Sequence, residues 1–175
     1  VSGGICYVHV LPPIDPTVLE GTDTVMEVIL SHLLFFLNHE MDQSQFKDYG
    51  SRAFQNERAD LYSDFKKCLS EVRTLQASSH TKDNIPKRND TLEALYQLGD
   101  SFDLKRDFYA LLRKFFRLIG KSIENSYLLV RLDDTDLQFQ KAYDVLEETR
   151  KYLCLPNVIV VMATDLDQLR LLVTQ

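Results

Sequence analysis

The sequence predicts an α/β domain built on a parallel sheet, and two observations favour this fold class. In the last third of the chain, a β-rich apolar run (127–132), a helical pattern (138–153) and a second apolar run (158–163) follow one another. A strand, a helix and a strand in that order form a right-handed crossover between parallel strands. An early apolar run, 5–11, ends at a Pro-Pro pair and supplies a further strand.

The composition is that of an ordinary globular chain. Of its 175 residues, 45% are hydrophobic and 26% are charged, which excludes collagen-like, low-complexity and disordered classes. Its apolar runs are shorter than the ~18 residues that a membrane span needs. The N-terminus also lacks the basic region of a signal peptide. We therefore expect a globular domain with no membrane span.

The charges and cysteines narrow the possible partners. Lys and Arg number 20 against 26 Asp and Glu, which gives a net charge of −6 and disfavours direct nucleic-acid binding. Cys6, Cys68 and Cys154 are widely spaced, with no CxxC or Cys/His cluster. This pattern indicates neither a zinc site nor a disulfide framework. Free thiols and no signal peptide predict a cytoplasmic protein.

The N-terminal segment predicts a strand followed by a helix. The strand covers 5–11, and its polar residue, His9, is interpreted as structural. Thr24 and Glu27 form a capping box, in which each side chain satisfies a free amide of the first helical turn. Helical spacing of apolar residues then continues to about His39.

The middle of the chain predicts helices separated by a polar loop. The predicted segments are a helix over about 57–76 with Cys68 in its apolar stripe, a loop over 77–90, a short helix over 91–99, and a longer helix that starts at Asp100 or Asp103 and stops at Gly120. The basic residues along the last helix are interpreted as a solvated face or a contact with an acidic partner.

Three segments follow from these patterns. A strand and helix occupy 1–42, a helical insertion occupies about 43–122, and the crossover with a final helix over 166–173 occupies 123–175. The continuous apolar run 158–163 is typical of a strand that is covered on both faces.

Acidic and hydroxyl side chains follow the two strands of the crossover. Asp133, Asp134 and Asp136 come after the first strand, and Thr164 and Asp165 come after the second. The carboxyl ends of adjacent parallel strands meet at one edge, where ligands of such sheets bind. Clustered carboxylates repel one another unless they bind a cation such as Mg²⁺ or position a water. The alternative is a turn in which Asp136 caps the next helix.

The same residues carry a resemblance to a known family. The runs LLVRLDDTDL (128–137) and NVIVVMATDLDQL (157–169) resemble the Walker B and sensor-1 strands of P-loop ATPases, nearest to the KAP and STAND branches of the AAA-like group. The segment 7–30 is similar to the second strand and helix of such domains. The resemblance implies a three-layer, P-loop NTPase-like parallel sheet with a helical insertion.

The resemblance also implies a site and an activity. Asp133 would hold Mg²⁺, Asp134 would orient the attacking water, and Asp136 would support the site. Thr164 or Asp165 would occupy the sensor-1 position. ATP and Mg²⁺ would be the cofactors of a regulatory or defence-type ATPase, as in bacterial immunity against phage. Its partners would include other domains of the parent chain, an effector protein or further copies of itself.

Two departures from this family matter. No G-x-x-x-x-G-K-[ST] phosphate loop occurs, so this chain alone is expected to be inactive. The opening residues run directly into an apolar stretch, so we expect a fragment whose phosphate loop precedes it. Arg131 interrupts a strand that should be buried; it either points to a partner acid or marks a more exposed strand.

Two other functions stay open at this point. One is a non-catalytic interaction module with a degenerate nucleotide site and structural acids. The other is a metal-dependent phosphohydrolase or nuclease in which His9 and Asp15 join the acidic cluster.

Overall fold

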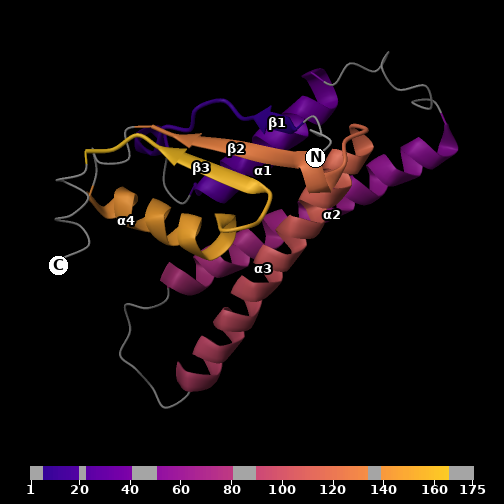
Figure 1. Ribbon diagram of the computed structural model, residues 1–175. Coiled ribbons are helices and arrows are strands. Elements are labelled where there is room, and N and C mark those ends of the chain that lie inside the picture. The colour runs from indigo at the N-terminus through magenta and orange to yellow at the C-terminus, as the bar shows by residue number, and fades with distance from the viewer. Residues whose placement is uncertain (1–5, 20–22, 41–50, 81–89, 134–138, 166–175) are drawn as a thin grey trace. The chain divides into compact units, whose positions relative to one another are not determined.

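The computed structural model describes residues 6–19, 23–40, 51–80, 90–133 and 139–165 (Figure 1). The chain separates into two compact units. Residues 1–41 and 119–175 form the first, which we call the sheet unit, and residues 42–118 form the second, which we call the hairpin unit.

The sheet unit contains three parallel strands in the order β1-β2-β3. They are β1 (Tyr7–Val10), β2 (Ser126–Leu132) and β3 (Val158–Met162). His9 pairs with Leu128 in the first ladder, and Leu128 pairs with Val158 in the second. The predicted α/β class with a parallel sheet is therefore confirmed.

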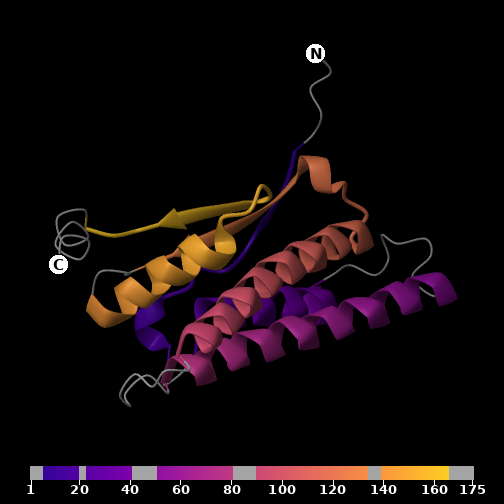
Figure 2. The same ribbon diagram turned by 90° about the horizontal axis from the view of Figure 1, so that it is seen from below.

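Both crossover helices of this unit lie on the same side of the sheet (Figure 2). They are α1 (Val25–Phe35) and α4 (Phe139–Glu148). The reason is topological: right-handed crossovers that advance in one direction across a sheet place their helices on one face. Met26 at the start of α1 donates its backbone N–H to Glu148 on α4.

The other face of the sheet is exposed. Leu128, Val130 and Leu132 of β2 are buried toward the helices. Ile159 and Val161 of β3 retain 43% and 53% of their accessible surface. The prediction that the apolar run 158–163 is covered on both faces is therefore wrong, because both crossovers take the same side.

Local signals explain where the sheet-unit helices begin. Thr24 Oγ1 accepts from the Glu27 N–H, and Glu27 Oε2 accepts from the Thr24 N–H, so the predicted capping box is confirmed.

α1 continues into a π-helical turn, Phe36–Glu40, and α4 into another, Thr149–Leu153. The helix predicted over 166–173 lies outside the described residues.

A buried asparagine ties together the amino ends of two strands. The Asn157 amide donates to the carbonyl oxygens of Ile123 (2.7 Å) and Ser126 (2.8 Å). Ile123 belongs to the short 3₁₀ helix Ile123–Asn125 that leads into β2. These bonds fix the turn before β3 against the start of β2.

The hairpin unit consists of two long helices, α2 (Arg52–His80) and α3 (Asp90–Leu118). Most residues of both predicted apolar stripes are buried, including Leu61 and Phe65 on α2 and Phe108 and Phe115 on α3. The prediction of two helices separated near Gly99 is wrong, since α3 is continuous through this residue. α2 also extends into the segment predicted as a loop.

The end of α3 follows a recognisable stop signal. Gly120, two residues beyond Leu118, has φ of 71°, a left-handed conformation that glycine adopts without steric cost. This is the stop that the sequence predicted.

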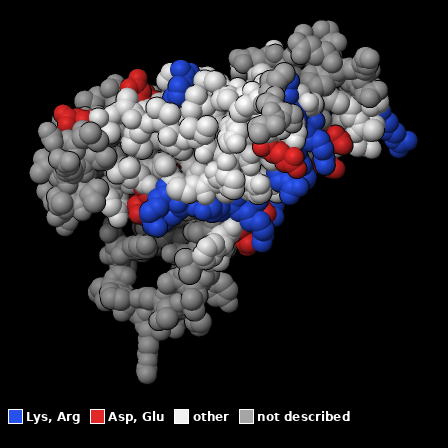
Figure 3. Space-filling view, in the orientation of Figure 1, with Lys and Arg blue, Asp and Glu red and all other residues white. Residues whose placement is uncertain are grey.

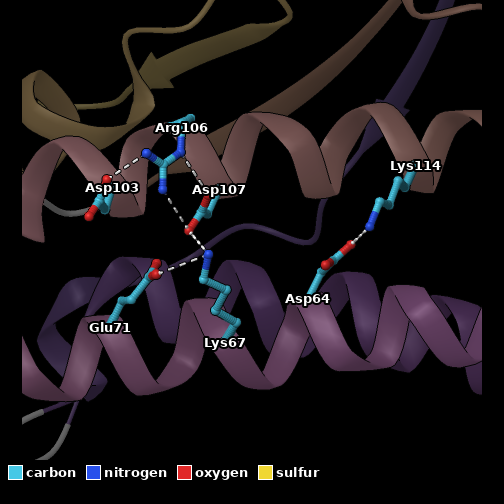
Figure 4. Close-up of polar contacts among 7 residues, drawn as sticks. All are labelled: Asp64, Lys67, Glu71, Asp103, Arg106, Asp107 and Lys114. Carbon is cyan, nitrogen blue, oxygen red and sulfur yellow. Dashed lines mark hydrogen bonds and ion pairs between the residues drawn. The ribbon is translucent and has the colours of Figure 1, made fainter.

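Ion pairs between α2 and α3 show that the helices run antiparallel (Figure 4). Lys67 contacts Asp107, and Lys114 Nζ lies 2.5 Å from Asp64 Oδ2, so residues further along α2 meet residues earlier on α3. Arg106 adds a bond from Nε to Asp107 Oδ1 at 3.0 Å. Hydrogen bonds from Lys67 and Arg106 outweigh the effect of burial and lower the pKa of Asp107.

Candidate functional site at the carboxyl end of the sheet

Asp133 and Thr164 follow two adjacent strands at the carboxyl end of the sheet. Leu132 pairs with Met162, and the Ala163 N–H donates to the Leu132 carbonyl at 2.8 Å. The ladder therefore continues one step beyond β3. Continuing this register puts Asp133 opposite Ala163, with Thr164 one residue further along, and successive side chains of a strand point to opposite faces. The two predicted site residues thus share one edge of the sheet, with the Asp133 side chain exposed and the Thr164 hydroxyl buried.

The backbone of Asp133 is held on its other side by the segment after β1. Ile14 forms a parallel bridge with Leu132. The Ile14 N–H donates to the Arg131 carbonyl (2.8 Å), and the Asp133 N–H donates to the Ile14 carbonyl (2.9 Å). Asp133 thus leaves the sheet from a fixed position, with its side chain exposed.

Thr164 carries an unsatisfied hydroxyl. Its Oγ1 atom is buried and has no hydrogen-bond partner in the part of the chain that the structure describes. A buried hydroxyl without a partner costs about 1–3 kcal/mol, and a bound ligand or water would offset this cost. Asp165, the next residue, is exposed.

Asp134 and Asp136 lie outside the described residues. Among the residues that are described, no cluster of three or more His, Cys, Asp or Glu side chains is arranged to hold a metal ion. The described oxygen groups at this edge that suit Mg²⁺ or a phosphate are the carboxylates of Asp133 and Asp165 and the Thr164 hydroxyl.

Two residues considered for phosphodiester chemistry have other roles. Asp15 Oδ1 caps the 3₁₀ helix Pro16–Val18, accepting from Thr17 N (2.8 Å) and Thr17 Oγ1 (2.6 Å). His9 is buried within β1, where its ring meets Phe36 edge-on at 4.5 Å. Burial lowers the pKa of His9 to about 4, so the ring is neutral near pH 7. The interpretation of His9 as structural fits this position.

Arg131 points out of the exposed face of β2. Its Nε and Nη2 donate to the Leu11 carbonyl at 3.2 and 2.9 Å. Of the two explanations for this residue, the structure supports a strand more exposed than assumed. The alternation of Leu128, Val130 and Leu132 with Arg131 was the sequence signal for a half-exposed strand.

Sequence reasoning missed Glu148. Its Oε2 accepts the Met26 N–H at 3.3 Å, in the first turn of α1. Burial raises the pKa of Glu148 to about 7, although the hydrogen bonds from Met26 and Val25 oppose this rise. The sequence gives no signal for the contact, because it joins helices 122 residues apart.

The described helices include none with the length and apolarity needed to cross a membrane. Neither a scan against protein-family models nor a search of curated proteins found a match to this chain.

Proposed function

We propose that this chain is part of a Mg²⁺-ATP-binding and hydrolysing domain of a regulatory or defence-type ATPase similar to the KAP and STAND groups. A segment outside residues 1–175 supplies the phosphate loop. The observation that carries the proposal is the placement of Asp133 and Thr164 on adjacent strand ends, one with an exposed carboxylate and the other with an orphaned hydroxyl.

The strand order supports the same proposal. In the resembling family, the strand of the phosphate loop lies beside the sensor-1 strand. Here β3 stands in the sensor-1 place, and it forms the outer edge of the described sheet next to β2. An apolar edge strand of this kind needs a partner, because its unpaired amides otherwise invite aggregation.

The proposed chemistry rests on positioning. Asp133 holds Mg²⁺, which supplies positive charge to phosphate oxygens, and Thr164 or Asp165 contacts the transferred phosphoryl group or its water. Asp134 orients the attacking water, and Asp136 supports the site. Catalysis in such sites is mostly positioning and charge neutralisation. Three free thiols agree with a cytoplasmic location, which belongs to the same proposal.

ATP turnover by the full-length protein tests this function. Asp134→Asn should lower turnover by about a hundredfold or more while nucleotide binding persists, because only the positioning of water is lost. Glu124→Gln is the matched control, since Glu124 is exposed at the amino end of β2, away from the site. Turnover that stays unchanged in Asp134→Asn would contradict the proposal.

The alternative is a non-catalytic interaction module with a degenerate nucleotide site. The exposed apolar face of the sheet favours it, because such faces mark contacts with other proteins. It predicts that Asp133→Ala combined with Asp134→Ala leaves partner binding intact and raises stability by relieving repulsion. Loss of activity in a folded double variant would count against it.

A further inference from the structure

The exposed face of the sheet is a continuous apolar surface, which we call the open face. It comprises side chains of all three strands that alternate with the buried ones: Val8, Val10, Tyr127, Leu129, Arg131, Ile159 and Val161. Figure 3 shows mainly uncharged atoms over the strands on the side that faces the viewer. The helices α1 and α4 cover the opposite side (Figure 2).

The register makes the open face a single patch. Val10 pairs with Leu129 and Leu129 with Ile159, so one row crosses all three strands. Arg131 pairs with Val161 one step further toward the carboxyl end. Val8, Val10, Ile159 and Val161 keep between 40% and 53% of their accessible surface. Large apolar side chains grouped in this way indicate a contact surface.

The dimensions match one helix. The two outer strands are roughly 10 Å apart, and the five residues of β3 extend roughly 16 Å. A helix is about 10–12 Å wide and needs about 11 residues to cover that length.

Arg131 adds a charge requirement. Two of its nitrogens are held by the Leu11 carbonyl, which fixes the guanidinium at one end of the patch. None of the ion pairs among the described residues includes Arg131. A guanidinium held beside an apolar surface pairs best with a carboxylate, because its remaining donors match two carboxylate oxygens.

We propose that the open face docks one amphipathic helix of about three turns from outside residues 1–175, with its apolar stripe on the strands and an acidic side chain against Arg131. This inference goes beyond the proposed ATPase site and does not depend on it. The docked helix would give the sheet a second covering layer, as sheets with one apolar face left bare require.

A peptide selection tests the proposal with residues 1–175 as the target. The probe is a phage-displayed library of helices of about 14 residues, with Leu or Ile at i, i+3, i+4 and i+7 and random residues elsewhere. Selected peptides should carry Asp or Glu near one end. Ile159→Asp should weaken their binding by about tenfold or more, whereas Tyr143→Asp should not, because Tyr143 is equally exposed on α4.

Reversing the charge at Arg131 gives a test that does not depend on loss of binding, and so cannot be explained by an unfolded variant. Selection against Arg131→Glu should replace the acidic position by Lys or Arg. The proposal is overturned if no helix is enriched, or if the acid preference survives Arg131→Glu. It is also overturned if residues 1–175 form a dimer that Ile159→Asp dissociates, because the occupant would then be a second copy.

Discussion

Glu148 has a partly buried carboxylate that accepts a hydrogen bond from the first turn of α1. Burial, with smaller contributions from the nearby Asp144 and Glu27, raises its pKa from an ordinary value of 4.5 to about 7, against the opposing effect of the hydrogen bonds from Met26 and Val25. A proton is therefore bound more tightly in the folded chain than in the unfolded chain. Stability then falls as pH rises from about 4.5 to about 7, where the unfolded chain has already lost this proton.

We predict that Glu148→Gln flattens this pH dependence. The glutamine oxygen can still accept the Met26 N–H, but no charge is buried at pH 8. The variant should be more stable than the wild type at pH 8, by on the order of 1–3 kcal/mol, and close to it at pH 4.5. Urea unfolding at the two pH values measures the difference.

Glu147→Gln is the matched control one residue earlier. Hydrogen bonds from Arg150 and Lys151 lower the pKa of Glu147, so its carboxylate stabilises the fold above its ordinary pKa. This variant should therefore lose stability at pH 8 relative to pH 4. If Glu148→Gln and Glu147→Gln shift stability in the same direction at pH 8, the assignment for Glu148 is wrong.

At the scale of elements, the sequence predicts helix type better than helix continuity. The sequence showed apolar stripes with helical spacing on both sides of residue 99, but Gly99 was interpreted as the end of the first helix. In the structure it lies inside α3, exposed, with open space where a Cβ would stand. Nothing local forces the helix to end there, and the packing of α3 against α2 keeps it continuous, as tertiary contacts override weak propensities.

Gly99→Ala should accordingly stabilise the protein by about 0.5–1 kcal/mol, because alanine loses less backbone entropy in a helix and meets no neighbour. Gly120→Ala should destabilise it by about 1 kcal/mol, since φ of 71° strains any residue with a Cβ. Thermal unfolding compares the two variants. A loss of stability in Gly99→Ala would show that α3 breaks at this residue.

At the scale of the whole molecule, the sequence predicted the parallel sheet because the apolar runs and the crossover helix are local patterns. It also predicted that Asp133 and Thr164 follow adjacent strands at one edge, because strand ends are set by topology. It did not predict the open face. The run 158–162 is uniformly apolar, so its composition is the same for a strand covered on both faces and for one covered on a single face.

The order of the strands in the sheet determines whether β3 is covered on one face or on both. No single segment of the sequence specifies that order. Both crossovers advance from β1 through β2 to β3, so both helices fall on one side. Arg131 was the local sign of the outcome, since a charged side chain at an alternating position needs solvent or a partner. Contacts such as Met26 with Glu148 were beyond sequence reasoning, because they join side chains far apart along the chain.

Calorimetric titration of the full-length protein with ATP, with and without Mg²⁺, tests the proposed site most directly. We predict Mg²⁺-dependent binding that weakens by about tenfold or more in Asp133→Asn and in Thr164→Val, and stays unchanged in Glu124→Gln. Thr164→Val should keep its stability, because it removes a hydroxyl that has no partner among the described residues. A full-length protein that binds no Mg²⁺-ATP, or binds it equally well in all three variants, would contradict the site.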